Sequence, residues 1–216
     1  MFRWFGLPIL QFSPVVWQTR HAPIFRPVFA FSMLAHPFSV GNVPMPSKRS
    51  VDFGRLDVRV GRVVAVRKHP NADSLYVAHV ELAELQPRTV IAGLVKFVGL
   101  EELQNRLVVC LCNLRPSKKR GIDSHAMILC ASTEQKVEPL ELSDQSSPPG
   151  SLIICPNFAR QPDKVLKKSI WEEIALDMLV SGTGECVFKG TPLRVDAEDG
   201  ASSLVTAPTL RNVPVK

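Results

Sequence analysis

The sequence predicts a mainly β protein in which a small five-stranded barrel is followed by a smaller, mostly-β subdomain. Three observations predict this class. Apolar runs of strand length recur between residues 51 and 135, turn-forming residues separate them, and 45% of the 216 residues are hydrophobic, which is enough for a sizeable core. Charged residues make up 21% of the chain, which excludes a wholly disordered protein.

The first 50 residues differ in composition from the rest. They hold nine of the fifteen aromatic residues and five lysines and arginines, but no acidic residue. Prolines interrupt the apolar stretches, so no span of about 20 residues remains for a transmembrane helix, and we expect no membrane partner. We expect a disordered leader. An acid-free, arginine-bearing N-terminus is also typical of a transit peptide, which leaves mitochondrial or plastid import as an alternative.

Five strands and one short helix are predicted between residues 51 and 135. The first strand, 56–67, is rich in valine and contains Gly61, which suggests a bend or bulge. Turn-forming residues at 69–73 end it. A helix is expected at 100–104, where two glutamates suit the first turn. The other strands are expected at 75–82, 89–94, 106–113 and 126–131. A helix between the third and fourth of five strands is the element order of the OB-fold.

The smaller subdomain is predicted from residue 136 onwards. A loop rich in Ser, Pro and Gly covers 143–151, a strand-like run follows at 152–155, and a helix is expected at 163–177. The predicted organisation is therefore a leader over 1–50, an OB-fold domain over 51–135 and an appended subdomain over 136–216.

The net charge of +6 is unevenly distributed along the chain. Residues 1–50 and 51–120 each carry +5, whereas residues 121–216 carry −4. A basic middle followed by an acidic region indicates a polyanion partner for the middle. Neutralised phosphates release counterions, so a basic surface binds nucleic acid with an affinity that falls with salt. A solvated protein surface is the alternative explanation of the same charges.

The basic residues of the middle form two clusters. Four cations lie within six residues in the loop before the last barrel strand: Arg115, Lys118, Lys119 and Arg120. Four more lie on or just after the first strand: Arg59, Arg62, Arg67 and Lys68. The first, fourth and fifth strands of such a barrel can be neighbours, so we expect both clusters on one surface. Few aromatic residues accompany them, since 51–131 contains only Phe53, Tyr76 and Phe97, which favours recognition of a folded RNA by its backbone and shape.

Patterns of an enzyme, a metal site or a bound cofactor are missing from the sequence. No phosphate-binding glycine loop, nucleophile elbow or zinc-protease motif occurs, and the histidines are scattered. The five cysteines have no zinc-ligand spacing and form no disulfide framework. We expect structural thiols in a reducing compartment, no cofactor and no catalytic residue.

Several motifs together resemble the tRNA-binding domain of the endothelial monocyte-activating polypeptide II type. This domain occurs in the auxiliary protein of the multi-synthetase complex and at the C-terminus of animal tyrosyl-tRNA synthetase. The resemblance covers residues 55–189 and rests on these segments: 69–77 (HPNADSLYV), 87–90 (PRTV), 93–94 (GL), 105–108 (NRLV), 112–114 (CNL) and 124–127 (SHAM). Lys119 replaces a usual Met, His125 replaces a usual Gln, and the tail after Gly190 diverges.

The resemblance implies an OB-fold followed by a subdomain that occupies the place of a second protomer, hence a monomer with an internal pseudo-dimer. It carries Lys118, Lys119, Arg120, Ser124 and Met127 over as binding positions. Together with the charge pattern, it gives this set of residues predicted to bind tRNA: Arg59, Arg62, Arg67, Lys68, Arg106, Arg115, Lys118, Lys119, Arg120, Ser124 and Met127.

The expected function is that of a cytoplasmic, non-catalytic tRNA-binding accessory protein. Its expected partners are tRNA and an aminoacyl-tRNA synthetase or the multi-synthetase complex. The alternative is a cytokine-like or protein-docking module, because residues 59–65 (RVGRVVA) resemble a heptapeptide tied to cytokine activity in secreted fragments of the family. A core segment of the first strand explains the same seven residues.

Overall fold

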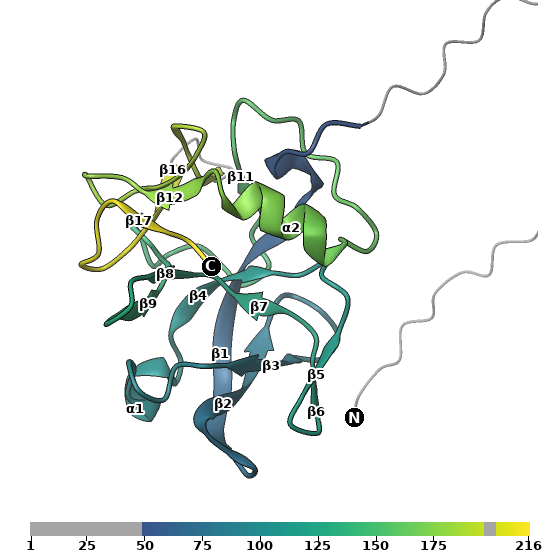
Figure 1. Ribbon diagram of the computed structural model, residues 1–216, viewed down its shortest axis with the longest axis vertical. Coiled ribbons are helices and arrows are strands. Elements are labelled where there is room, and N and C mark those ends of the chain that lie inside the picture. The colour runs from purple at the N-terminus through teal and green to yellow at the C-terminus, as the bar shows by residue number, and fades with distance from the viewer. Residues whose placement is uncertain (1–48, 197–201) are drawn as a thin grey trace, which may run out of the picture. The chain divides into compact units, whose positions relative to one another are not determined.

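An antiparallel five-stranded sheet that curls into a nearly closed barrel forms the first part of the protein (Figure 1). The computed structural model describes residues 49–196 and 202–216. The predicted leader and its import alternative therefore lie outside the described residues, except for Arg49 and Ser50. The sheet order is β3-β2-β1-β4-β7, with β1 (Val58–His69), β2 (Ala72–Glu81), β3 (Arg88–Ala92), β4 (Leu107–Leu111) and β7 (Met127–Ile128). The predicted mainly β class and five-stranded barrel are confirmed.

Individual hydrogen bonds join the edge strand β3 to Ser124 and His125, which lie just before β7. The backbone N–H of Ile91 donates to the hydroxyl oxygen of Ser124 at 3.0 Å, and that hydroxyl donates to the carbonyl of Ala126 at 3.0 Å. The N–H of His125 donates to the carbonyl of Thr89 at 2.9 Å. These bonds satisfy polar groups that an open sheet edge would expose.

The barrel contains two short helical turns, one before β1 and one between β3 and β4. A 3₁₀ turn, η1 (Phe53–Arg55), precedes β1, and the carboxylate of Asp52 caps it by accepting from the N–H of Gly54 at 2.9 Å. The predicted helix between the third and fourth strands is present as α1 (Leu100–Leu103). Leu103 is fully buried and fastens this turn to the barrel interior.

Gly61 lies in β1 at a point of close packing inside the barrel. A Cβ atom there would lie 2.5 Å from Cγ1 of Val80 and 3.1 Å from Cδ2 of Leu82. Only glycine lets the strands approach so closely. The pairing of β1 with β2 is irregular between Val63 and Ala65 and again between Lys68 and His69, so the strand carries bulges, although not at Gly61 itself.

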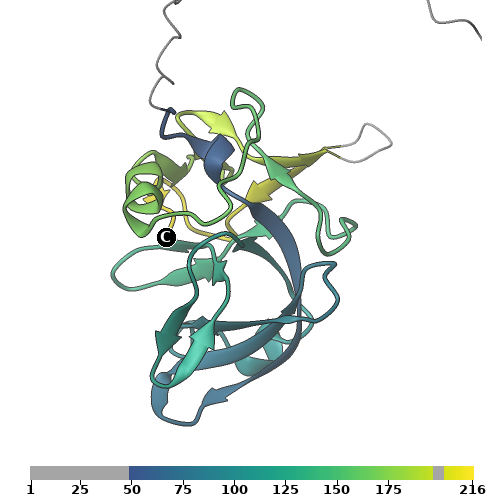
Figure 2. The ribbon, with the colours of Figure 1, turned by 90° about the vertical axis from the view of Figure 1, so that its right-hand side faces the viewer.

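The second part of the described chain packs on one end of the barrel, as Figures 1 and 2 both show. It contains one helix, α2 (Lys168–Ala175), and three small antiparallel sheets. The first pairs β8 (Cys130–Ser132) with β9 (Val137–Pro139). The second has the order β10-β16-β15-β11, from β10 (Glu141–Leu142), β16 (Ser202–Thr206), β15 (Arg194–Asp196) and β11 (Ile153–Ile154). The third has the order β14-β13-β12-β17, from β14 (Thr191–Pro192), β13 (Cys186–Phe188), β12 (Met178–Val180) and β17 (Val213–Pro214).

Two predicted elements differ from the structure because long-range hydrogen bonds act on them. The strand expected at 126–131 divides, since Cys130 exchanges backbone hydrogen bonds with Lys216 and then pairs with β9. The helix expected at 163–177 begins only at Lys168. Before it, the N–H of Leu166 donates to the carbonyl of Asn113 at 2.7 Å and keeps the chain extended.

Strand β4 is buried on both faces and separates two hydrophobic cores. Val108 and Cys110 point into the barrel core. Leu107, Val109 and Leu111 point the other way, into a core shared with the second part of the chain. This explains why the strand is a continuous apolar run rather than an alternating one. Each fully buried leucine or valine contributes about 1.5–3 kcal/mol.

The amide of Asn113 ties three segments together just after β4. Its oxygen accepts from the N–H of Asp57 at 3.1 Å. Its nitrogen donates to the carbonyls of Arg55 and Asp163, at 3.0 and 2.9 Å. Asp163 also forms an ion pair with Arg55 at 2.7 Å. The start of the second part is thereby fixed to the start of the barrel.

All five cysteines are free and buried, as predicted. Burial raises the pKa of the Cys112, Cys130 and Cys186 thiols to about 12. The thiols therefore stay protonated and serve as small apolar core groups.

A buried carboxylate, that of Glu138, holds the segment that leads into β17. It accepts from the backbone N–H groups of Thr209 and Leu210, each at 2.9 Å, and forms an ion pair with Lys136 at 2.6 Å. Burial acts to raise the pKa of Glu138, but these hydrogen bonds and those of the side chains of Lys136 and Thr209 outweigh it. They lower the pKa from 4.5 to about 2.

We predict that Glu138→Gln destabilises the fold at neutral pH. A lowered pKa in the folded state means that the carboxylate stabilises the fold above about pH 4.5, and that this contribution is lost as the pH falls toward about 2. The variant should lose about 1–3 kcal/mol at pH 7 and show a flatter pH dependence over that window. Urea unfolding between pH 2.5 and 7 measures both, with the exposed Glu134→Gln as control. Parallel curves for Glu138→Gln and wild type would contradict the assignment.

Candidate nucleic-acid interface

Three of the four predicted loop cations, Lys118, Lys119 and Arg120, lie on a short β-hairpin, and Arg115 precedes it. Strands β5 (Ser117–Lys119) and β6 (Ile122–Ser124) pair from Ser117↔Ser124 to Lys119↔Ile122. Only Arg120 and Gly121 form the turn, with φ of 48° and 101°. Positive φ at both turn residues is the type I′ geometry, which matches the twist of the flanking strands. Lys118, Lys119 and Arg120 are thus held on a hydrogen-bonded hairpin.

Arg120 occupies a backbone conformation that a non-glycine residue adopts at a cost. The left-handed region costs an L-residue about 1–2 kcal/mol, and Asn, Asp or Gly is usual at this turn position. An arginine here places a guanidinium at the outermost point of the hairpin. Local strain of this kind is typical of functional positions.

His69 links the hairpin to the end of β1. Its Nδ1 accepts from the backbone N–H of Asn71 at 3.0 Å. Its Nε2 lies 3.2 Å from the carbonyl oxygen of Lys119. Because Nδ1 accepts, the proton of the neutral ring is on Nε2, which donates to that carbonyl. His69 is 4% exposed, so its buried side chain connects β1 to β5 as part of the fold.

Six of the predicted cations are exposed and have no acidic partner within ion-pair distance among the described residues. They are Arg67, Lys68, Arg115, Lys118, Lys119 and Arg120. We call them the basic cluster. Since no carboxylate neutralises it, the cluster keeps its positive potential for an external anion.

Arg59, Arg62 and Arg106 are not brought to the basic cluster. Arg59 precedes Arg67 by eight residues on β1, about 26 Å at about 3.3 Å per residue. The end of β1 that carries Arg67 and Lys68 is the end next to the hairpin, because the neighbouring His69 contacts the carbonyl of Lys119. Arg62 donates to the carbonyl of Asn105 at 3.3 Å.

Arg59 and Arg106 are held by carboxylates. Arg59 pairs with Asp57 at 2.6 Å and Glu84 at 3.3 Å. Burial would raise the pKa of Asp57, but Arg59 and Arg160 lower it below its ordinary value. Arg106 pairs with Glu102 at 3.0 Å and with Glu141 at 3.1 Å. These arginines connect parts of the fold, which explains their charge without a ligand.

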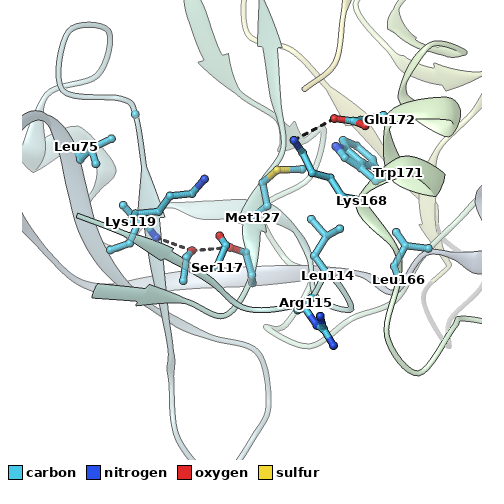
Figure 3. Close-up of a pocket in the computed structure, with 14 residues that line it drawn as sticks. Leu75, Leu114, Arg115, Ser117, Lys119, Met127, Leu166, Lys168, Trp171 and Glu172 are labelled. Carbon is cyan, nitrogen blue, oxygen red and sulfur yellow. Dashed lines mark hydrogen bonds and ion pairs between the residues drawn. The ribbon is translucent and has the colours of Figure 1, made fainter. Parts of the chain in front are cut away.

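A cavity of about 520 Å³ opens beside the hairpin, between the barrel edge and α2 (Figure 3). Ser124 and Met127, both predicted as binding positions, line it. The Ser124 hydroxyl is engaged in closing the barrel, so its role at the site is to hold the wall in place. Met127 is half-buried and presents its thioether side chain to the cavity.

The far wall of the cavity carries residues that the predicted site did not include. Trp171 and Lys168 come from the first turns of α2 and lie opposite Met127 (Figure 3). Trp171 lies outside residues 51–131, where few aromatic residues were expected beside the cations. The available signal was the pair Lys167-Lys168, which precedes this tryptophan by three residues.

Comparisons with known proteins show the family of the chain. Residues 58–151 match the family described as "Putative tRNA binding domain". The crystal structure of the C-terminal domain of Plasmodium vivax p43 matches with a TM-score of 0.70 at 30% identity, over 77% of this chain and 100% of that chain. The chain belongs to the tRNA-binding domain family of the endothelial monocyte-activating polypeptide II type.

Two curated relatives extend the comparison. The cytoplasmic methionine–tRNA ligase of Caenorhabditis elegans is 48% identical over 178 residues, 82% of this chain and 19% of that protein. The aminoacyl tRNA synthase complex-interacting multifunctional protein 1 of Cricetulus griseus is 46% identical over 175 residues, 80% of this chain and 47% of that protein. The chain thus spans less than half the length of either relative.

Among residues 49–196 and 202–216, no group of three or more His, Cys, Asp and Glu side chains is arranged to hold a metal ion. No helix among them is long and apolar enough to cross a bilayer.

We predict that His69→Ala loosens the basic hairpin. Without the imidazole, the carbonyl of Lys119 and the N–H of Asn71 lose their partner, and the hairpin is held to β1 less tightly. Limited trypsin digestion followed by mass spectrometry should show faster cleavage after Lys118, Lys119 or Arg120. The control is His125→Ala, which removes an exposed imidazole nearby. Equal cleavage rates in both variants and wild type would show that His69 does not hold the hairpin.

Proposed function

We propose that this chain is a non-catalytic accessory protein that binds tRNA through its basic cluster. The observation that carries the proposal is an unneutralised group of cations on and beside a hydrogen-bonded hairpin, next to a cavity, in a member of a tRNA-binding family. Phosphate oxygens of the RNA backbone are the natural ligands of such a group. Arg59, Arg62 and Arg106 are assigned to the fold.

The proposed partner is an aminoacyl-tRNA synthetase or a complex of synthetases. One curated relative is named a methionine–tRNA ligase, and another is named for its interaction with a synthase complex. A weak contact to tRNA, physically linked to an enzyme, raises the effective concentration of tRNA at the enzyme's own site. The proposed mechanism therefore needs no catalytic residue in this chain. We place the protein in the cytoplasm, as the name of the ligase relative states for that relative.

The cytokine-like alternative gains no support from the arrangement of residues 59–65. They form the middle of β1, where Val60, Gly61 and Val63 are buried. A packed central strand is not presented to a receptor. We therefore keep the explanation of this segment as part of the barrel core.

We predict that replacing Lys118, Lys119 and Arg120 together by alanine weakens tRNA binding and its salt dependence. Each lost phosphate contact lowers the slope of log affinity against log salt by about 0.7–0.9, so the slope should fall by about 2–3. Filter binding between 50 and 200 mM salt, roughly, measures it.

The charge control for this experiment is the double variant Lys136→Ala/Lys189→Ala. Both lysines are exposed, but they are paired with Glu138 and Asp177. Their removal should change the slope by less than one unit. An unchanged slope in the triple variant, with tRNA still bound, would refute the role of the hairpin.

We also propose that the chain is a monomer, because the second part of the chain already covers the outer faces of β1 and β4. A second copy would find no apolar strand face there to bury. Light scattering after size-exclusion chromatography should give a mass near 23.9 kDa at micromolar concentration. A mass of twice that value would contradict the proposed internal pseudo-dimer.

A further inference from the structure

The cavity between the barrel edge and α2 has apolar walls and a cationic rim. Leu75, Ile91, Leu114, Met127 and Trp171 supply its apolar surface. Arg115 and Lys119 supply positive charges around it, whereas Lys168 forms an ion pair with Glu172 of the lining at 3.2 Å (Figure 3). Its volume of about 520 Å³ lies within the range of about 300–1,000 Å³ that small ligand groups occupy. Such walls suit a flat apolar group that has negative charges beside it.

Trp171 forms part of the cavity wall and carries a hydrogen-bond donor. The residue is only 8% exposed, and no hydrogen bond joins its indole N–H to another of the described residues (Figure 3). Buried tryptophans usually find a partner for this N–H. The donor lies at a cavity wall, so a ligand with an acceptor atom would satisfy it.

We propose that this cavity binds one unpaired nucleobase of the bound tRNA. The base inserts between the barrel edge and α2 and accepts the Trp171 N–H at a ring nitrogen or carbonyl oxygen. Arg115 and Lys119, which have no carboxylate partner among the described residues, hold the phosphates beside it. This inference rests on the proposed function and adds a second mode of recognition to phosphate binding.

An unpaired base fits better than a base-paired one or an acidic peptide. Bases inside an A-form helix are stacked and cannot enter a side pocket, whereas bases in loops and at ends can. An acidic peptide would neutralise the positive charges of the rim but would leave the apolar walls of the cavity uncovered. The basic cluster beyond Lys119 continues along the hairpin, which gives the RNA backbone a path away from the pocket.

Gly93 allows the pocket to be filled with little change to the fold. It lines the cavity, and a Cβ atom there would meet only Cδ2 of Leu75, at 3.8 Å. Gly93→Leu therefore places a side chain in the pocket. The matched control is Gly99→Leu, because a Cβ atom at Gly99 meets nothing within 4 Å and Gly99 lies outside the cavity.

The first experiment measures affinity of the full chain for tRNA and for a blunt-ended RNA duplex of similar length. Gly93→Leu should weaken tRNA binding roughly tenfold, as expected for one lost base contact, and leave the salt slope and duplex affinity unchanged. Gly99→Leu should change neither. If Gly93→Leu left tRNA affinity unchanged, or weakened duplex binding equally, the proposed base pocket would be wrong. The proposed tRNA binding by the basic cluster would still hold. A wild-type chain that bound no tRNA would overturn both proposals.

The second experiment uses the fluorescence of Trp171. The chain has three tryptophans, so a full-length variant with Trp4→Phe and Trp17→Phe keeps Trp171 alone. Saturating tRNA should quench its emission, and the RNA duplex should not. Oligoglutamate tests the peptide alternative: quenching by it, without quenching by tRNA, would assign the pocket to a protein partner and overturn the proposal. Trp171→Phe, which keeps an aromatic ring but removes the N–H, should bind tRNA more weakly than wild type.

Discussion

The two-sided burial of β4 is the constraint on which the rest of the structure depends. One face of this strand completes the barrel, and the other carries Leu107, Val109 and Leu111 into the core of the second part. The two parts therefore share a wall and cannot move as separate bodies without exposing it. Asn113 continues this connection immediately after the strand. As a result, α2 stands at a fixed place beside the barrel edge, and the cavity has two rigid sides.

Charge is arranged in two ways on this framework. The arginines that connect segments are each paired with a carboxylate: Arg55 with Asp163, Arg59 with Asp57, Arg88 with Glu84 and Arg106 with Glu141. The cations of the hairpin have no such partner among the described residues. A net charge of +6 thus understates the local potential, because the acidic residues are used elsewhere. Paired arginines stabilise the fold, and unpaired ones remain free for an anion.

Much of the barrel could be predicted because its signals are local. The valine-rich first strand, the turn at His69–Asn71 and the acidic first turn of α1 all act within a few residues. The remainder depended on distant partners. The residues around Asp163 do not indicate that its carbonyl will accept a hydrogen bond from Asn113. Those around Arg59 do not indicate its ion pair with Glu84. Trp171 was missed for the same reason, since the wall opposite it comes from residues far away in the sequence.

The barrel interior also contains three thiols side by side in the same core, those of Cys110, Cys112 and Cys130. A protonated, enclosed thiol reacts only when the surrounding structure opens. The rate at which a soluble alkylating reagent labels these side chains therefore measures how often the barrel opens spontaneously. An RNA that binds across β3 and β7 would lower this labelling rate. The three cysteines can thus report how RNA binding changes the internal motion of the barrel.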